Sequence, residues 1–279
     1  RIPGTRYALG SPVDGYLKGV TDQWLLVAPD ANPAMLEMFR DRERKPHRDL
    51  LPWSGEFAGK YLTSAAQVLR LTGDPKLRDY LAGFVSELVR LQTEDGYLGP
   101  WPERYALPGK APNCWKGRDP WDAWGHYHIM VGLLFWYQDT GDRKALACTR
   151  RIADLICRMF QDRKRRRLVD TGSTEMNLAV VHSLCLLYRV SPEQRYLDMA
   201  LQIVDEFAAT SKGEPLAGDY LNAGLQGREF FDTPKPRWES LHPIMGLVEL
   251  YWLTGEERFR EAFEQIWWSI VKLDRHNNG

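Results

Sequence analysis

The sequence lacks the features that mark several large classes of protein. Its 37 Lys and Arg are balanced by 37 Asp and Glu, which leaves no cationic surplus for nucleic acid or an anionic membrane surface. No apolar run approaches the roughly 20 residues that span a bilayer, and the opening Arg1-Ile2-Pro3-Gly4 has no apolar signal core. We therefore expect neither nucleic acid nor membrane as a partner. The compartment stays open, because the chain does not begin with Met.

Motifs of common catalytic and metal centres are also missing. The sequence has no Walker loop, no dinucleotide-binding fingerprint after a strand and no G-x-S-x-G elbow. The four cysteines are Cys114, Cys148, Cys157 and Cys185. They show no C-x-x-C spacing, and three lie in apolar helical patterns typical of buried free thiols. We therefore predict no metal site and no cofactor within this chain.

What the sequence does contain is a helical hairpin in four copies. Each copy has an apolar helix, a short turn, and a second helix with Leu, Ala and aromatic residues at three- and four-residue spacing. The turns are Thr72-Gly73-Asp74-Pro75, Thr140-Gly141-Asp142, Ser191-Pro192-Glu193 and Thr254-Gly255-Glu256. Such hairpins must stack to bury their apolar faces, as a solenoid or as a closed (α/α) toroid. Large aromatic-rich loops between them favour the toroid.

The predicted fold is therefore all-α, an (α/α)6-type toroid that occupies residues 33–279. Residues 1–32 are expected to form an extended segment packed on the toroid, with short strands at Tyr7-Ala8-Leu9 and Trp24-Leu25-Leu26-Val27, before a helix near Pro33 to Arg42. Six hairpins of roughly 60 residues would need about 360 residues. We therefore expect a toroid that is incomplete at its C-terminus and is closed by a missing C-terminal segment or a partner.

Aromatic and polar residues gather where the first helix of each hairpin begins. The segments are Trp53-Ser54-Gly55-Glu56, Trp121 to His128, Ser173 to Asn177 and Trp238 to His242, and the glycine- and proline-rich connection 95–102 carries Tyr97. In a toroid these helix starts surround one mouth, where indole faces can pack on a sugar and polar groups can bind its hydroxyls. Ordinary helix capping and a purely structural loop are the alternatives. The candidate substrate-binding residues are Trp53, Glu56, Tyr97, Trp121, His128, Glu175, Asn177, Trp238, Glu239 and His242.

Helical spacing predicts which of these side chains meet. Glu239 and His242 are three residues apart and can touch, whereas His126 and His128 are two apart and cannot both point at the toroid axis. His128 shares a stripe with the tryptophans before it and is the better candidate. His182 lies deeper in an apolar helix and is interpreted as a core residue.

Taken in order, these motifs resemble glycoside hydrolase family 127, the β-L-arabinofuranosidase-like group. The resemblance rests on Trp53 to Leu62, Asp95-Gly96-Tyr97-Leu98, Trp121 to His128 with Gly132-Leu133-Leu134, Glu175-Met176-Asn177 and the Thr-Gly-Asp/Glu turns. It covers nearly the whole chain. It implies a glycosidase acting on a plant or microbial glycan, with an (α/α)6 barrel followed by β-sandwich domains.

The resemblance also implies a retaining mechanism in which a zinc-bound cysteine is the nucleophile. The family holds zinc with a glutamate and cysteines that follow the segment matching Asp274 to Gly279, and none of the four cysteines here matches them. Zinc is thus implied only through residues beyond Gly279. The family's general acid is expected there too, so Glu56, Glu175 and Glu239 are interpreted as sugar-binding and the catalytic residues of this chain as unknown.

Two other functions fit the same pattern. In a sugar 2-epimerase-like toroid, two histidines exchange a proton beside a carbonyl, which requires His128 and His242 to face each other across the pocket. A carbohydrate-binding toroid without catalysis is the other alternative.

Overall fold

The computed structural model describes residues 10–103, 107, 109–162 and 166–275, and this part of the chain is almost wholly helical. The elements in chain order are α1 (Ser11–Val20), a π-helical turn (Thr21–Leu25), α2 (Ala28–Ala31), α3 (Ala34–Arg40), α4 (Phe57–Thr72), α5 (Pro75–Arg90), α6 (Asp122–Thr140), α7 (Arg143–Phe160), α8 (Thr174–Asn177), α9 (Val180–Val190), α10 (Gln194–Glu206), β1 (Thr210–Ser211), β2 (Glu214–Pro215), α11 (Tyr220–Leu225), α12 (Leu241–Thr254) and α13 (Glu257–Ser269). Strands β1 and β2 pair antiparallel in a small hairpin. The all-α prediction is confirmed.

The four predicted hairpins are α4–α5, α6–α7, α9–α10 and α12–α13. Their turns form as expected: Gly73, Gly141 and Gly255 take left-handed backbone conformations with φ of 65°, 74° and 73°. The side chains of Asp74 and Asp142 then accept hydrogen bonds from backbone amides of the following helix. Each turn thus ends one helix and begins the next without a long loop.

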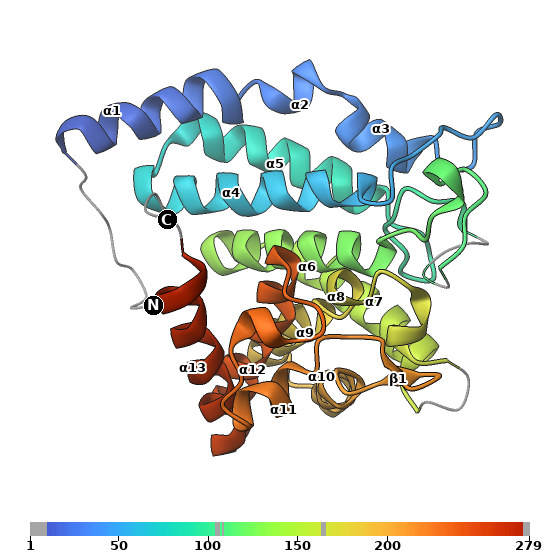
Figure 1. The fold of residues 1–279 in the computed structure, drawn as a ribbon. Coiled ribbons are helices and arrows are strands. Elements are labelled where there is room, and N and C mark those ends of the chain that lie inside the picture. The colour runs from blue at the N-terminus through green and yellow to red at the C-terminus, as the bar shows by residue number, and fades with distance from the viewer. Residues whose placement is uncertain (1–9, 104–106, 108, 163–165, 276–279) are drawn as a thin grey trace.

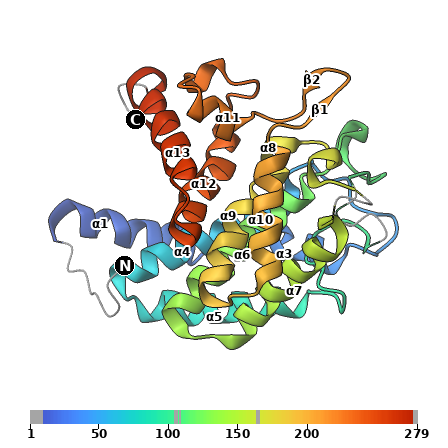
Figure 2. The same ribbon diagram turned by 90° about the horizontal axis from the view of Figure 1, so that it is seen from below.

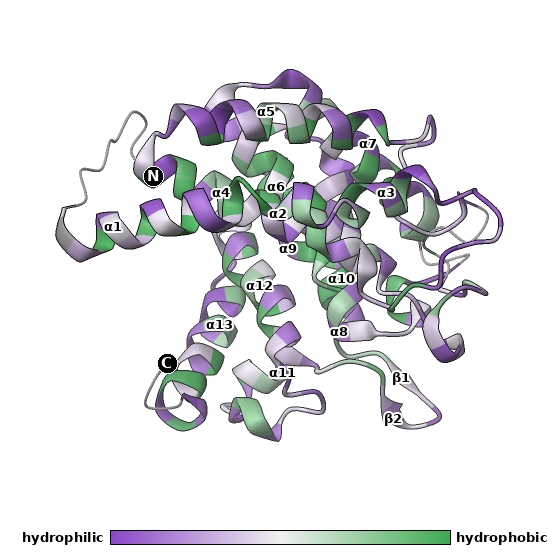
Figure 3. Cartoon of the chain, turned by 90° about the horizontal axis from the view of Figure 1, so that it is seen from above, coloured by the Kyte–Doolittle hydropathy of each residue, from purple (hydrophilic) through white to green (hydrophobic). Residues whose placement is uncertain are grey.

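The hairpins stand side by side in an (α/α) toroid arrangement (Figures 1 and 2). The first helices α4, α6, α9 and α12 pack on one another in that order, and the second helices α5, α7, α10 and α13 lie outside them. Figure 3 shows the consequence in hydropathy, with hydrophilic residues along the outer helix α5 and hydrophobic residues on the inner helices α6 and α9. All first helices therefore start at the same end of the molecule.

Glycines bring the inner helices unusually close together. A Cβ atom on Gly59 of α4 would lie 2.2 Å from the backbone carbon of His128 in α6. Gly246 of α12 similarly faces a side chain of Val181 in α9, 2.6 Å from the position of a Cβ. This close approach of α4 and α6 places the start of α4 directly beside the first turns of α6.

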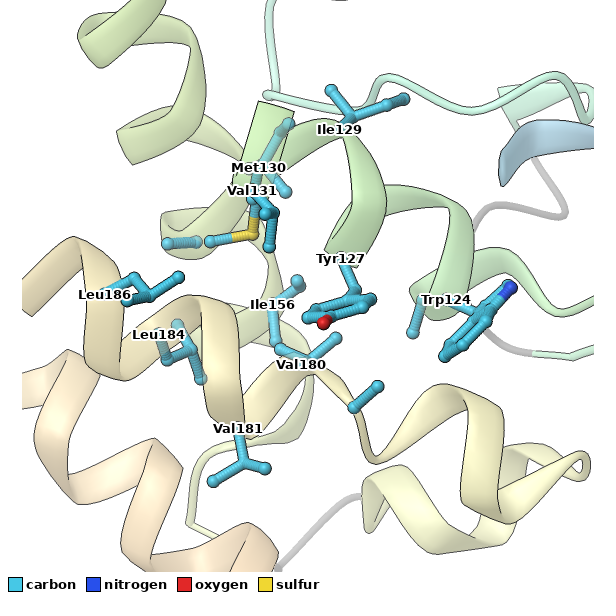
Figure 4. Close-up of a cluster of buried hydrophobic side chains, with 14 of the residues drawn as sticks. Trp124, Tyr127, Ile129, Met130, Val131, Ile156, Val180, Val181, Leu184 and Leu186 are labelled. Atoms are coloured by element: carbon cyan, nitrogen blue, oxygen red, sulfur yellow. The ribbon is translucent and has the colours of Figure 1, made fainter. Parts of the chain in front are cut away.

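Side chains from α6 and α9 fill the space between these inner helices (Figure 4). Trp124, Tyr127 and Met130 project from α6 toward Val180 and Leu184 of α9, and all five are buried. Three-residue spacing along α6 and four-residue spacing along α9 produce this shared face. The part of this face at Met130 and Leu184 is apolar core, whereas Trp124 and Tyr127, nearer the start of α6, meet polar groups.

The N-terminal segment differs from the prediction. The expected strand at Trp24 to Val27 is wrong, because these residues lie in the π-helical turn that follows α1 and in the bend after it. The hydroxyl of Tyr61 donates to the Leu25 carbonyl, 2.6 Å away, and this bond joins the turn to α4. The helix expected near Pro33 to Arg42 is α3. The strand expected at Tyr7 to Leu9 lies outside the described residues.

Within the ranges given above, none of the helices combines the length and the apolar character needed to cross a membrane.

Candidate functional site

The centre of the candidate site is Trp124, on the first turn of α6. Its indole is fully buried, and its Nε1–H donates to a carboxylate oxygen of Glu56, the residue before α4. The ring centroid lies 4.3 Å from that of His128 and 4.7 Å from that of His242, both edge to face. The ring of Trp238, before α12, is 5.9 Å away. Helix starts from three hairpins thus converge on one indole.

Glu56 forms a buried ion pair at this point. Only 6% of the residue is exposed, and the Nζ atom of Lys60 lies 2.8 Å from its second oxygen, one helical turn further along α4. The same ammonium sits over the ring of Trp238 at 5.0 Å and over that of Trp124 at 5.5 Å. Lys60 was not among the predicted site residues, although its spacing of four from Glu56 is a signal for such a pair.

Tyr127 connects two histidines of the cluster. Its hydroxyl lies 2.8 Å from Nδ1 of His242 and 3.0 Å from Nδ1 of His182. Burial lowers the pKa of His242 to about 4, with help from the Lys60 charge, and the pKa of His182 to about 3. Both imidazoles are therefore neutral near pH 7. His182 is buried as predicted, but the interpretation as plain core missed its bond to Tyr127.

His128 is the predicted histidine that faces the cluster. It is 6% exposed, its ring lies 4.8 Å from that of Tyr127, and its Nε2 atom has no hydrogen-bond partner among the described residues. Burial, followed by His242 and Lys60, holds its pKa well below the ordinary value. His126 points elsewhere, since its Nε2 accepts from the backbone amide of Leu98 at 3.0 Å.

Two further candidates form an aromatic pair beside the cluster. The rings of Trp53 and Trp121 lie 5.3 Å apart at 51°, and both residues are partly exposed. The backbone amide of Trp121 donates a hydrogen bond to the Pro52 carbonyl, 2.8 Å away, and this bond joins the segments that carry the two tryptophans. With Trp238, whose exposure is 55%, this pair supplies the accessible aromatic surface among the candidates.

Glu175 and Glu239 are each 3% exposed, and their carboxylates lie near Tyr220. Glu239 forms two bonds to the guanidinium of Arg237, at 3.0 and 3.1 Å. This pair replaces the contact with His242 that spacing had suggested. Glu175 accepts from the Thr174 hydroxyl at 2.8 Å. Burial is the main cause of the raised pKa of Tyr220, and the two carboxylates add to it.

Tyr97 does not reach the mouth, so that part of the prediction is wrong. It is fully buried, and its hydroxyl donates to the carboxylate of Asp122 at 3.1 Å while accepting from the backbone amide of Trp101 at 3.3 Å. A buried tyrosine must satisfy its hydroxyl, and Asp122 in the first turn of α6 supplies the partner. Tyr97 therefore stabilises the first turn of α6 and does not contact the candidate site.

Asn177 is also placed behind the cluster. Its side-chain oxygen accepts from the backbone amide of Trp124 at 3.2 Å, and its amide donates to the Thr171 hydroxyl at 2.9 Å and the Gly172 carbonyl at 3.0 Å. The side chain thus satisfies one of the unpaired amides at the start of α6. It fixes the position of Trp124 from the side of α8.

The described residues offer no group of three or more His, Cys, Asp or Glu side chains that could hold a metal ion. The cysteines are separate and buried, and burial raises the pKa of Cys114 to about 11 and the pKa values of Cys148 and Cys157 to about 12. They are thiols rather than thiolates near pH 7. That zinc is held by residues beyond Gly279 stays a prediction.

The geometry does not match the requirement of the epimerase alternative. The rings of His128 and His242 lie 5.4 Å apart, edge to face, and therefore contact each other directly. A sugar carbon between two proton-transferring imidazoles would need hydrogen-bond reach on both sides, which is wider than this separation.

Comparisons with known proteins identify the family of this chain. Residues 14–276 match the family described as β-L-arabinofuranosidase, GH127 catalytic domain. A non-reducing end β-L-arabinofuranosidase from Bifidobacterium longum subsp. longum is 26% identical over 147 residues, which cover 52% of this chain and 22% of that protein.

Two solved structures share the fold. A GH127 β-arabinofuranosidase superposes with a TM-score of 0.66 at 19% identity over 88% of this chain and 39% of its own. A GH127 β-L-arabinofuranosidase from Geobacillus stearothermophilus T6 gives 0.66 at 17% identity over 96% of this chain and 45% of its own. The chain thus spans less than half the length of these relatives. With the family match over nearly all its residues and the shared helical fold, the chain belongs to the GH127 β-L-arabinofuranosidase catalytic-domain family.

Proposed function

We propose that the protein is a glycoside hydrolase of the β-L-arabinofuranosidase type and that the Trp124 cluster binds its sugar. The observation that carries the proposal is the convergence of Glu56, His128 and His242 on one buried indole, from the starts of three inner helices. Family membership supports the reaction class, because the relatives named above are described as β-arabinofuranosidases.

Each part of the cluster has a task in binding a furanose. The exposed face of Trp238 can pack on the C–H face of the sugar, as indole rings do at carbohydrate sites. The Nε2 of His128 is buried without a partner, and a sugar hydroxyl that entered the cluster would supply one. The ion pair of Glu56 and Lys60 supplies a charged acceptor and donor at the same place.

No catalytic step is assigned to these residues. The described part of the chain holds no set of side chains that fits zinc. Burial raises the pKa values of its four cysteines despite nearby cations, so they are thiols rather than thiolate nucleophiles near pH 7. We therefore propose that the nucleophile and the general acid of this reaction lie outside the described residues.

The test is hydrolysis of an aryl β-L-arabinofuranoside by the full-length protein. Release of the aryl group, and none from the α anomer, is the expected result. Binding without release would favour the carbohydrate-binding alternative and contradict hydrolysis. Proton exchange at the carbon next to the carbonyl of a free sugar, followed in heavy water, would support the epimerase instead.

Replacement of Trp238 by Ala tests the sugar-binding role. Loss of the stacking surface should raise KM about 10-fold, which corresponds to about 1.4 kcal/mol, with a smaller change in kcat. Trp252→Ala is the matched control, since Trp252 is also exposed but lies near the opposite end of α12. Equal KM values for the two variants would show that Trp238 does not bind the sugar.

We also propose that additional protein covers the outer aromatic face of the last hairpin. Trp267 and Trp268 are each more than half exposed on α13, and exposed aromatic surface is typical of an interface. Acrylamide should quench the fluorescence of these tryptophans in the full-length protein less than in residues 1–279 alone; equal quenching would contradict the proposal.

A further inference from the structure

Tyr127 occupies a special position, because its single hydroxyl lies between two imidazole nitrogens of the same kind. Nδ1 of His242 is 2.8 Å away and Nδ1 of His182 is 3.0 Å away. The two histidines come from α12 and α9, and Tyr127 from α6. One hydroxyl thus joins three inner helices within the candidate site.

Hydrogen counting restricts what these contacts can be. A tyrosine hydroxyl has one proton to donate, and a neutral imidazole has one N–H that sits on either Nδ1 or Nε2. Tyr127 can donate to only one of the two Nδ1 atoms. The other nitrogen, at the same hydrogen-bonding distance, must carry its own proton and donate it to the phenolic oxygen.

We propose that Tyr127 holds His182 and His242 in opposite tautomers, so that one presents a protonated Nε2 and the other a bare Nε2. The histidine whose Nδ1 accepts the Tyr127 proton is the Nε2–H tautomer. The other histidine is the Nδ1–H tautomer with a bare Nε2.

The surroundings keep this arrangement intact. Burial lowers the pKa values of both histidines and raises that of Tyr127, so all three groups are neutral near pH 7. The charged groups that act on the pair are Lys60, on the side of His242, and Arg189, on the side of His182. Both are cations, and both oppose protonation of the imidazoles.

The consequence is a donor and an acceptor of fixed identity at one end of the toroid. A pair of neighbouring sugar hydroxyls offers a matching acceptor and donor. Tyr127 therefore acts as a positioning residue that determines which orientation of these hydroxyls the two histidines can bind. This last step rests on the proposed function; the tautomers themselves do not.

The test is nitrogen NMR of the full-length protein labelled with 15N in its histidine rings, at pH 7 and without sugar. His182→Gln and His242→Gln variants assign the signals. The expected spectrum shows a protonated Nδ1 and bare Nε2 for one of these two histidines, and the reverse for the other. Two identical tautomers, or an imidazolium at either position, would overturn the proposal, whether or not the protein hydrolyses arabinofuranosides.

Tyr127→Phe removes the hydroxyl and keeps the ring. We expect the tautomer pattern of at least one of the two histidines to change, and KM for the proposed substrate to rise about 5-fold through the loss of one ordered hydrogen bond. Tyr61→Phe is the control, because Tyr61 is also buried but bonds the Leu25 carbonyl. Unchanged patterns in Tyr127→Phe, or the same change in Tyr61→Phe, would refute the inference.

Discussion

At the residue scale, Glu56 shows how a buried charge can be kept in an aromatic site. Its two oxygens are used by different partners, the indole N–H of Trp124 and the ammonium of Lys60. A buried carboxylate without such partners would be strongly unfavourable. The pair therefore fixes the start of α4 to that of α6 and orients Lys60 over the tryptophan rings.

Replacement of Glu56 by Ala should lower the free energy of unfolding by about 2 kcal/mol, because it leaves a buried indole N–H and a partly buried ammonium without partners. Gln should cost less, since its oxygen can still accept from Trp124. Glu264→Ala, at an exposed position on α13, is the control and should change little. Chemical denaturation measures all three, and equal effects of the Ala changes would contradict this role of Glu56.

The pKa of His242 makes stability depend on pH. The folded value is about 4, below the ordinary value of 6.5, so between these limits the unfolded chain binds a proton that the folded chain does not. The contribution is complete above pH 6.5 and is lost as the pH falls toward 4. At pH 5 the loss is about 2 kcal/mol.

His242→Asn removes this titration. The variant should lose less stability than the wild type between pH 7 and pH 5, even if it is less stable at pH 7. Denaturation curves at the two pH values measure the difference. Parallel losses in both proteins would show that His242 titrates normally.

Residue pattern alone identified part of this cluster. The sequence pattern at the starts of the helices predicted Glu56, His128, Trp238 and His242 as site residues, and in the structure all four lie around Trp124. Tyr97 was placed wrongly, because the sequence does not show that its hydroxyl finds Asp122 inside the fold. Tyr127 was missed because a buried tyrosine in an apolar helix looks like core until its hydrogen-bond partners are known.

At the scale of elements, the hairpins could be predicted because each carries its own local signals. Apolar periodicity marks the helices, and a glycine followed by Asp or Glu marks three of the four turns. The run Trp24-Leu25-Leu26-Val27 was wrongly predicted to be a strand, because a short apolar run does not distinguish a strand from a helix. Here Leu25 is buried beneath α4 while Trp24 is exposed, as on a helical turn.

The close packing of α4 on α6 depends on Gly59. A Cβ there would lie 2.2 Å from a backbone carbon of His128, and backbone cannot move aside as a side chain can. Gly59→Ala should therefore lower the free energy of unfolding by about 3 kcal/mol and disturb the contact between Glu56 and Trp124.

Gly83→Ala is the matched control in the next helix. A Cβ at Gly83 would meet no atom within 4 Å, so alanine should raise stability by about 1 kcal/mol through its better helix propensity. Thermal unfolding measures both variants. Similar effects of the two changes would contradict the packing described for α4 and α6.

At the scale of the whole molecule, the toroid arrangement places the starts of all inner helices at one end. The Trp124 cluster forms because these helix starts lie side by side. Sequence separation is large, since Glu56 and His242 lie 186 positions apart and yet both contact Trp124. No local pattern contains such a contact. It follows from the order of the hairpins and from the close approach of their inner helices.

The most direct measurement is a crystal structure of the full-length protein with L-arabinose bound. We expect the sugar against the face of Trp238, with hydroxyls in hydrogen-bond distance of Glu56, His128 or His242. A sugar bound away from these residues, with the Trp124 cluster empty, would contradict it.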